Sequence, residues 1–322
     1  MNPKPVHHPV LLEAFLDAVQ PKSGERWIDG TFGRGGHTTA LLERGVKVLA
    51  LDQDAEAEAA AVLVKERWGE SFHFFRENFR EMKRVSESMG WEKVEGILLD
   101  LGVSSPQFDQ AERGFSFRME GPLDMRMDMR QFLTAARIIS GESEEGLSRI
   151  FWELGEDRDS RKIARAIVKA REVTPIETTT QLAELVSATV PWRKAKGIHP
   201  ATQVFQALRL KVNEEIAVLE EVLPEGTALL SEEGRFAVIS FHSGEDKRVK
   251  RFFQRHAAAE LENPRNGWLE PNPERWYGRV KRFLPEEAEI QLNPRSRSAR
   301  LRVAWKSLKE EKKRKYYEPK SS

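Results

Sequence analysis

The chain has 322 residues, of which 39% are hydrophobic and 32% are charged, and it contains no cysteine. The absence of cysteine excludes a disulfide framework, a thiolate metal site and a covalent cysteine nucleophile, and we expect a reducing, cytoplasmic setting. No stretch reaches the roughly 20 apolar residues of a membrane helix, and Glu13 and Asp17 interrupt the apolar N-terminal stretch. We therefore expect neither a membrane span nor a signal peptide.

The net charge of +1 hides a segregated distribution of charge. Residues 291–322 carry 11 Lys/Arg and 3 Glu, and residues 158–211 carry 11 Lys/Arg and 4 acidic residues. Residues 106–157, in contrast, carry 6 Arg and 11 acidic residues. Basic segments of this kind suit a polyanionic partner such as a nucleic acid.

The first hundred residues alternate between strand and helix patterns. Strands are expected at 26–31, 46–51, 72–76 and 94–103, and the helices between them at 37–44, 54–68 and 81–89. This βαβαβαβ order predicts an α/β fold with a doubly wound, mostly parallel sheet of the Rossmann-like type.

The alternation stops after residue 105. Helices are expected at 144–154, 158–171, 180–189, 201–221 and 245–259, a fifth strand at 235–241 and a hairpin within 280–306. We therefore predict a discontinuous α/β domain, residues 1–105 and 215–322, interrupted by a helical substrate-binding domain, residues 106–214. Such an insert follows the carboxyl end of a strand, which is where open α/β sheets bind ligands.

A glycine-rich turn, DGTFGRGGH, follows the first expected strand at residues 29–37. Gly33, Gly35 and Gly36 allow a sharp turn and a close approach of the backbone to a ligand. The spacing differs from the G-x-G-x-x-G pattern of dinucleotide-binding proteins.

Two acidic positions flank this turn in the predicted fold. Asp52 ends the second strand, where an acid can accept hydrogen bonds from ribose hydroxyls, and Asp54 is the alternative for that role. Asp29 suits a cationic ligand better than a pyrophosphate, since its carboxylate can act as a counter-charge, directly or through water. The pattern favours S-adenosylmethionine, which carries an ammonium and a sulfonium group, as the cofactor.

The fourth expected strand leads into Ser105, Pro106, Gln107 and Phe108. This tetrapeptide resembles the Ser/Asn/Asp-Pro-Pro-Tyr/Phe motif of aminomethyltransferases that act on cytosine N4 or adenine N6, with Gln107 in place of the second proline. The Ser105 hydroxyl and a carbonyl near Pro106 could accept the hydrogens of an exocyclic amine, and Phe108 could stack on the base. We interpret Ser105, Pro106 and Phe108 as the catalytic group.

Other candidate residues have alternative explanations. His37 either contacts the cofactor or caps a helix, and Ser243 with Asp246 resembles a capping box beside His242. The methionines of the 119–129 loop are packing residues or an adaptable cover for the cofactor. The histidines show no metal-ligand spacing, so we predict no metal.

A basic stripe is expected on the helix at 158–171. Its members recur on one helical face, and they are Arg158, Arg161, Lys162, Arg165 and Lys169. The opposite face holds Ile163, Ala166, Ile167 and Ala170. The stripe is either a solvated surface or a surface that binds RNA phosphates.

Eight segments together resemble one family, the bacterial 16S ribosomal RNA cytosine-N4 methyltransferases (the RsmH or MraW family). The segments are HHPVLLEA at 7–14, IDGTFGRGGHT at 28–38, GILLDLGVSSPQFD at 96–109, ERGFSFR at 112–118, GPLDMRMD at 121–128, HPAT..FQALR at 199–209, ISFHSGEDKRVKRF at 239–252 and NPRSRSARLR at 293–302. They span nearly the whole chain in order. Gly244, where family members usually have Leu, and the segment 263–277, which has no recognisable motif, depart from the pattern.

The resemblance implies a cytoplasmic class I methyltransferase that uses S-adenosylmethionine and has an inserted helical substrate-recognition domain. It implies N4-methylcytosine in the decoding region as the product, with 16S rRNA or the small ribosomal subunit as the partner and no membrane partner. The family's cofactor positions fall on Gly35, Gly36, His37, Asp52, Phe79, Asp100 and Gln107, with Phe79 stacking on adenine. We expect a monomer or a homodimer. A non-catalytic RNA-binding assembly factor and a DNA aminomethyltransferase are the competing hypotheses.

Overall fold

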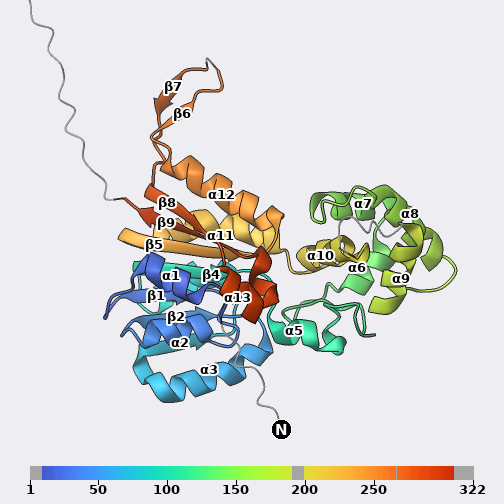
Figure 1. The fold of residues 1–322 in the computed structure, drawn as a ribbon, viewed down its shortest axis with the longest axis horizontal. Helices are drawn as coiled ribbons and strands as arrows, with labels where there is room; N and C mark the ends of the chain where they lie inside the picture. Colours follow the sequence, from blue (N-terminus) through green and yellow to red (C-terminus); the bar gives the residue numbers. More distant parts are fainter. Residues whose placement is uncertain (1–8, 191–198, 266, 308–322) are drawn as a thin grey trace, which may run out of the picture.

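The computed structural model describes residues 9–190, 199–265 and 267–307, with every side chain in those ranges except those of Ser105 and Pro106. The chain forms a layered α/β body and a separate group of helices beside it (Figure 1). His7, His8 and the basic residues after 307 lie outside the described residues.

A seven-stranded sheet in the order β3-β2-β1-β4-β5-β9-β8 forms the centre of the body. The strands are β1 Arg26–Asp29, β2 Lys47–Leu51, β3 Phe72–Phe75, β4 Val94–Asp100, β5 Leu230–Ser240, β8 Tyr277–Phe283 and β9 Arg300–Lys306. The pairs among the first five strands are parallel, and β8 and β9 join antiparallel. The chain order reverses between β1 and β4, so a crevice forms at their carboxyl ends. The predicted Rossmann-like class is confirmed.

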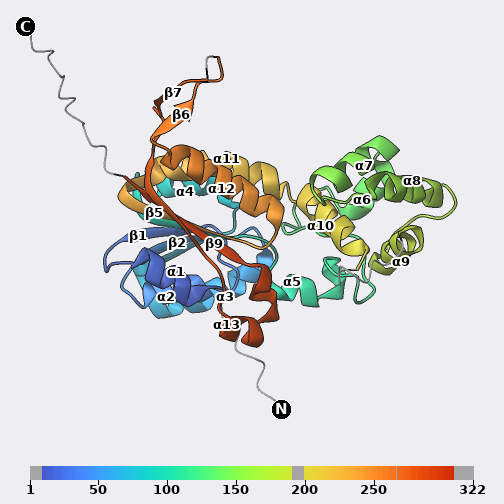
Figure 2. The same cartoon turned by 45° about the horizontal axis from the view of Figure 1, so that its top comes forward.

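Helices cover both faces of the sheet, as Figure 2 shows. One face packs against α1 Leu12–Val19, α2 Gly36–Leu42 and α3 Ala55–Trp68. The other face packs against α4 Met82–Ser88, α11 Glu215–Leu229 and α12 Ser243–Ala257. Because each face has its own apolar cluster, the central strands are buried on both sides, as their continuous apolar sequences predict.

The helical part has a third apolar cluster of its own, formed by residues between Phe115 and Val212. Its elements are α5 Ser105–Asp109, the 3₁₀ turn η3 Ala111–Arg113, α6 Ala135–Gly141, α7 Glu144–Glu153, α8 Ser160–Arg171, α9 Thr179–Thr189 and α10 Ala201–Val212. It therefore buries apolar side chains independently of the sheet, and we refer to residues 106–214 as the insert.

The single helix expected at 201–221 is wrong, because α10 ends at Val212 and α11 begins at Glu215. Glu214 has a left-handed backbone with φ of 51°. Asn213 donates to the carbonyls of Met125 and Arg209, and these bonds hold the break in place. The helical periodicity on both sides of Asn213 conceals this break in the sequence.

The predicted Ser243–Asp246 capping box is also wrong. His242 caps α12, since its Nδ1 accepts a hydrogen bond from Gly244 N–H at 3.2 Å. Glu245 completes this cap by accepting from the backbone of His242 at 3.4 Å. Asp246 instead pairs with Arg302 and Arg300.

The C-terminal hairpin is confirmed, and β8 and β9 are joined through α13 Glu287–Leu292 and the 3₁₀ turn η5 Pro294–Ser298. The segment without a motif, residues 263–277, contains β7 Leu269–Pro271, which pairs with β6 Glu260–Glu262 to form a small arm outside the main sheet. Figures 1 and 2 show this arm projecting from the body. Among the described residues, no helix has the length and apolar character needed to cross a membrane.

The packing of β1 against β4 generates a stability prediction. A Cβ at Gly96 would overlap the indole ring of Trp27, which is fully buried. We expect Gly96→Ala to lower the free energy of unfolding by about 1–3 kcal/mol, because overpacking forces the ring or the strand to move. Denaturant titration measures this loss. Gly141→Ala, whose Cβ meets nothing within 4 Å, is the control, and equal stability of the two variants would contradict the prediction.

Candidate functional site

A cleft of about 600 Å³ lies at the carboxyl ends of the parallel strands. One half is lined by the glycine-rich turn, the loop after β2 and Phe79. The other half is lined by the loop after β4, the start of α11 and the start of α12. The cleft is thus bordered by segments from both sides of the point where the strand order reverses.

The glycine-rich turn forms the floor of the first half. Gly35 has φ of 76° and is the N-cap of α2, a conformation that a side chain would strain. A Cβ on Gly36 would overlap the ring of Pro9. Gly33 donates its N–H to Asp52 at 2.7 Å, so the turn is tied to the end of β2. These contacts explain three of the four glycines in the turn.

Of the two ways in which Asp29 is expected to act as a counter-charge, directly or through water, its position argues against direct contact. Its carboxylate is 1% exposed, does not line the cleft, and accepts from Thr31 N–H at 3.1 Å and the Thr38 hydroxyl at 2.6 Å. Burial raises the pKa of Asp29 to about 6. Its charge therefore acts on the cleft through Asp100 and not by contact.

Asp100, at the end of β4, lines the cleft. Its Oδ1 is buried without a hydrogen-bond partner in the described part of the chain, and its Oδ2 lies 3.8 Å from His37 Nδ1. Burial, followed by the charges of Asp29 and Glu245, raises the pKa of Asp100 well above its ordinary value. A cation bound at Oδ1 would relieve both the missing hydrogen bond and the repulsion.

The structure distinguishes the two candidates for the ribose acid. Asp52 lines the cleft and accepts backbone N–H groups from Gly33 and Asp54, so each oxygen keeps a lone pair for a ligand. Burial raises the pKa of Asp52 to about 6. The Asp54 side chain is already bonded to Glu56 N–H, Gln107 and Arg113. This geometry favours Asp52.

The remaining predicted cofactor positions also lie at the cleft. Phe79 belongs to the 3₁₀ turn η2 Phe79–Glu81 and lines the half next to Asp52. His37 lines it too, but it contacts the carbonyl of Val10 at 3.1 Å and does not cap α2. Gln107 is 5% exposed, and its amide bonds to Asp54 and to Ser104 N–H.

The predicted catalytic group is described only in part. The side chains of Ser105 and Pro106 lie outside the described residues. Phe108 is 38% exposed and does not line the cleft. The guanidinium of Arg295, which does line the cleft, lies 5.6 Å from the ring of Phe108. Phe108 is therefore accessible beside the cleft and free to stack on a nucleotide there.

Sequence reasoning missed two acidic residues in the second half of the cleft. Glu215 begins α11 and is paired with Arg209 at 2.8 Å. Glu245, in the first turn of α12, is 2% exposed and lies 3.0 Å from His242 Nε2. Burial opposes ionisation of Glu245, but the bonds from His242 hold its pKa below the ordinary value. No spacing links residues 100, 215 and 245 in the sequence, so only the fold identifies them as neighbours of one cleft.

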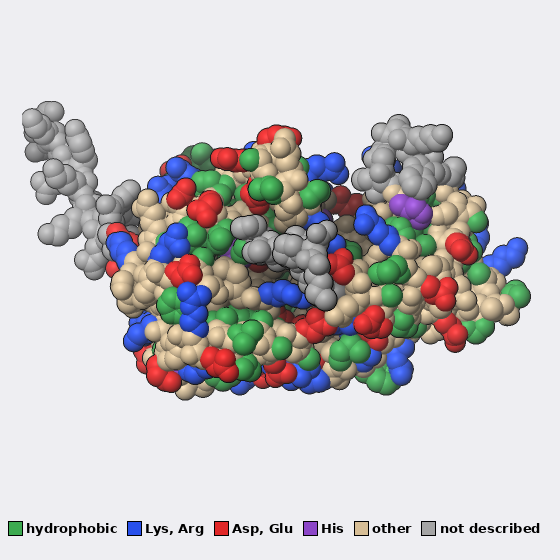
Figure 3. All heavy atoms as spheres, turned by 60° about the horizontal axis from the view of Figure 1, so that its bottom comes forward, with side chains coloured by type: hydrophobic (Ala, Val, Ile, Leu, Met, Phe, Trp, Pro, Cys, Tyr) green, Lys and Arg blue, Asp and Glu red, His purple; other side chains and the backbone are tan. Residues whose placement is uncertain are grey.

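Four of the five stripe residues lie on α8, at the outer side of the insert (Figure 1), whereas Arg158 precedes the helix, which begins at Ser160 and not at the expected residue 158. All five of its side chains are exposed, while Ile163 and Ile167 are buried as predicted. Ala164, and not Ala166 or Ala170, completes the buried face. Figure 3, which brings the lower side of the view in Figure 1 forward, shows basic and acidic side chains interspersed there with no continuous basic surface. Binding of phosphate by the stripe stays a prediction.

Within residues 9–190, 199–265 and 267–307, no group of three or more His, Asp or Glu side chains could hold a metal ion. The lining of the cleft includes the carboxylates of Asp52 and Asp100 and the ring of Phe79.

Comparison with known sequences finds relatives over the whole fold. The model of the MraW methylase family matches residues 4–307. The ribosomal RNA small subunit methyltransferase H of Methylacidiphilum infernorum (isolate V4) is 48% identical over 314 residues, covering 95% of this chain and 96% of the relative. The protein of the same name from Thermomicrobium roseum (strain ATCC 27502 / DSM 5159 / P-2) is 46% identical over 312 residues, covering 92% and 93%. The one from Heliobacterium mobile is 44% identical over 308 residues, covering 93% and 98%.

The raised pKa of Asp100 generates a prediction about stability. The folded-state pKa lies above the unfolded value, so the stability from protonated Asp100 is complete below about pH 4 and is lost as the pH rises through the folded-state pKa. We expect Asp100→Asn to raise the melting temperature of the ligand-free protein at pH 7.5, by about 2 °C for each kcal/mol of repulsion removed. The gain should shrink toward pH 5.

Calorimetry at the two pH values measures this difference. Asp17→Asn, which changes an exposed carboxylate of α1, is the matched control and should leave the melting temperature unchanged. A lower melting temperature for Asp100→Asn at pH 7.5 would contradict the prediction.

Proposed function

The chain belongs to the MraW methylase family, and on this premise we propose that it transfers a methyl group from S-adenosylmethionine to the N4 amine of a cytosine in 16S ribosomal RNA. The relatives' names support ribosomal RNA of the small subunit as the substrate. The observation that carries the proposal is the two-part cleft, with the orphaned Asp100 oxygen between its halves.

The residues of the first half suit S-adenosylmethionine. Asp100 would bind its cationic amino-acid end, Asp52 its ribose hydroxyls and Phe79 its adenine, over the backbone of Gly33 and Gly36, whereas Gly35 shapes the turn without lining the cleft. The bound cofactor supplies an electrophilic methyl group on a sulfonium. The chain's own contribution is to fix the reacting groups in line and to exclude water, which are the main sources of rate for a direct transfer.

The second half of the cleft suits an extruded base. An exocyclic amine is a poor nucleophile because its lone pair is delocalised into the ring, so acceptors around its hydrogens favour reaction. The backbone near Ser105 and the carboxylates of Glu215 and Asp100 supply acceptors on this side of the cleft. Phe108 and Arg295 offer a platform for a flanking base, and stacking of this kind contributes about 1–3 kcal/mol per base. The base has to be unpaired or flipped to enter.

Methyl transfer to defined nucleic acids tests the proposal. We expect tritium from labelled S-adenosylmethionine to appear in 16S rRNA or in assembled small subunits, and mass mapping to place it on one cytosine of the decoding region. DNA of the same sequence should stay unlabelled, because the ribose 2′-OH distinguishes the two substrates.

Each other result has a distinct meaning. Methyl transfer to DNA would support the competing hypothesis of a DNA aminomethyltransferase over that of an RNA methyltransferase. Tight RNA binding without transfer, by a protein that also binds the cofactor, would instead identify a non-catalytic assembly factor.

The stripe on α8 generates a second prediction. Replacing Arg161, Arg165 and Lys169 by Gln should weaken RNA binding and reduce the slope of log K against log salt by about 2, since each phosphate contact on single-stranded RNA contributes roughly 0.7. Binding measured at several salt concentrations gives the slope.

A triple variant of equal charge change provides the control. Lys22, Lys47 and Lys83 are exposed on the α/β body, away from the insert, and their replacement by Gln should leave the slope unchanged. Equal slopes for the two triple variants would show that α8 is a plain solvated helix.

A further inference from the structure

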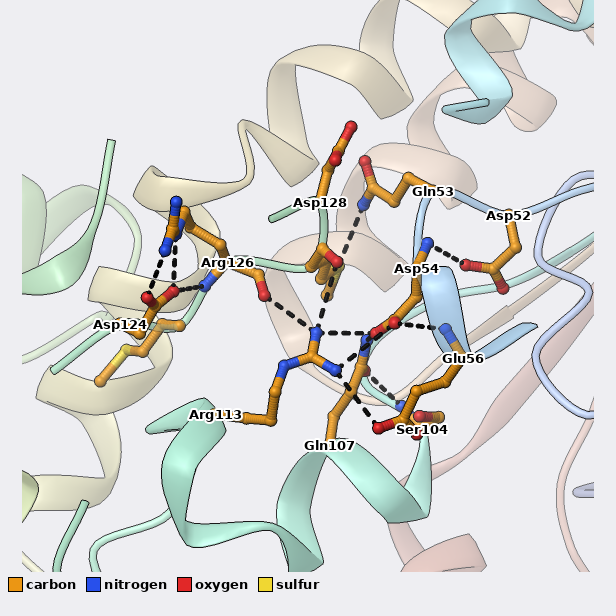
Figure 4. A network of polar contacts seen from close by, with 12 residues as sticks. Asp52, Gln53, Asp54, Glu56, Ser104, Gln107, Arg113, Asp124, Arg126 and Asp128 are labelled. Carbon is orange, nitrogen blue, oxygen red and sulfur yellow. Dashed lines mark hydrogen bonds and ion pairs between the residues drawn. The ribbon is translucent and has the colours of Figure 1, made fainter. Parts of the chain in front are cut away.

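A buried ion pair joins the insert to the cofactor half of the cleft. Arg113, in η3, donates to the two carboxylate oxygens of Asp54 at 2.7 and 3.4 Å. Arg113 is 8% exposed and Asp54 is 7% exposed. Figure 4 shows the pair at the centre of a network of polar contacts. We refer to these two residues as the Asp54–Arg113 pair.

On the cofactor side, a single hydrogen bond links the pair to Asp52, the acidic residue proposed to bind the ribose. Asp54 N–H donates to Asp52 Oδ1 at 2.9 Å, and the Asp54 side chain caps α3 through Glu56 N–H at 3.0 Å. The position of Asp54 therefore sets the orientation of the Asp52 carboxylate at the cleft wall.

On the substrate side, the pair holds the segment with the predicted catalytic group. Gln107 donates to Asp54 Oδ2 at 2.5 Å, and its own oxygen accepts from Ser104 N–H at 2.8 Å. Gln107 belongs to α5, and Ser104 immediately precedes that helix. The two hydrogen bonds of Gln107 therefore fix the start of α5 against α3.

On the insert side, the guanidinium binds a loop that borders the cleft. Arg113 donates to the carbonyls of Arg126 and Met127 at 3.1 and 3.3 Å. Met127 lines the cleft, and its N–H donates to Asn213 at the break between α10 and α11. Arg113 thus contacts the ribose-acid segment and the insert loop directly, and it is linked to the α5 segment through Asp54.

Stability alone is a poor explanation for this arrangement. Desolvation of two charges offsets most of their attraction, and replacement of a buried ion pair by apolar groups is often neutral or stabilising. Arg113 Nε is moreover buried with no hydrogen-bond partner in the described part of the chain. Only the forked guanidinium can reach a carboxylate and two carbonyls together, a geometry that lysine cannot reproduce.

We propose that Arg113 is a positioning residue that couples the cofactor site to the base site, a role that rests on the proposed function. It contacts both sides of the cleft through Asp54 and the insert loop without belonging to the surface assigned to either ligand. Binding of the cofactor at Asp52 orders the pair, which orders Gln107 and the Met127 loop for the base. By linkage, RNA must then strengthen cofactor binding by the same factor.

Calorimetry with S-adenosylhomocysteine, a product that cannot react, measures this coupling. Its dissociation constant is determined with and without saturating small-subunit RNA, and for the wild-type protein we expect the RNA to lower it about tenfold. Labelled methyl transfer by the same preparation reports on the proposed function separately.

A variant that removes only one of the two charges is unsuitable. Arg113→Met would leave the Asp54 carboxylate buried without its cationic partner and would unfold the protein. The double variant D54N/R113M removes both charges and retains a side-chain oxygen to cap α3. We expect it to keep the wild-type melting temperature within a few degrees but to reduce the coupling from about tenfold to about onefold. R113K should also fail to restore coupling, because an ammonium cannot make the forked contacts.

A matched double variant distinguishes coupling from general damage. Glu25 and Arg235 form an ion pair with side-chain exposures of 11% and 10%, against 10% and 9% for the Asp54–Arg113 pair, and it lies at the opposite end of the strands. E25Q/R235M should retain tenfold coupling.

The outcomes separate the two hypotheses. Full coupling in D54N/R113M, or no coupling in the wild-type protein, would overturn the role of Arg113. The proposed function would still stand in either case if the wild-type protein transfers the methyl group. Absence of methyl transfer by the wild type would overturn the proposed function, whatever the coupling.

Discussion

Carboxylates whose charges are poorly screened by water determine how the candidate site of this protein is organised. Asp29 and Glu245 are buried around the point where the order of the strands reverses, and their charges raise the pKa of the partly buried Asp100 between them. Burial itself raises the pKa of Asp29 from 3.8 to about 6, which corresponds to about 3 kcal/mol at neutral pH. Under the proposed function, a cationic ligand at Asp100 offsets the repulsion that Asp29 and Glu245 exert there.

The α/β architecture explains how these groups come together. Parallel strands end at one edge, so residues 29, 52 and 100 meet there although each follows a different strand. The fifth strand leads to His242 and Glu245 at the same edge, where α12 begins. The insert leaves the sheet after β4 and returns at α11, which places Glu215 on the wall of the same cleft. One topological rule thus assembles both halves of the site.

Prediction from the sequence succeeded where the signal is local. Strand patterns locate the sheet, and the glycine-rich turn and Asp52 line the cleft, as do Phe79 and Asp100, which the family resemblance and not a local pattern indicated. It failed where a tertiary contact decides the local structure. Asn213 breaks an otherwise continuous helical pattern by bonding to the Met125 carbonyl, 88 residues away in the chain.

The position of Asp29 shows the same limit for a functional residue. Its place at the end of β1 leaves open whether it acts on a ligand directly or through water, and only the tertiary structure shows that its oxygens are bonded to Thr31 and Thr38. The Asp54–Arg113 pair joins residues 59 apart with no shared motif. Long-range pairs of this kind leave no periodic signal, and they are the contacts that connect the insert to the cleft.

The opposite charges of the two proposed ligands explain the separation of charge along the chain. A cationic cofactor requires acidic groups in a buried cleft, whereas a polyanionic RNA is repelled by them and has to be attracted elsewhere. The exposed basic stripe on α8 belongs to the insert, while the buried carboxylates belong to the sheet edge. Because the two regions lie on different parts of the fold, neither cancels the field of the other at short range. A net charge of +1 is therefore the sum of two opposed requirements and not the absence of electrostatic function.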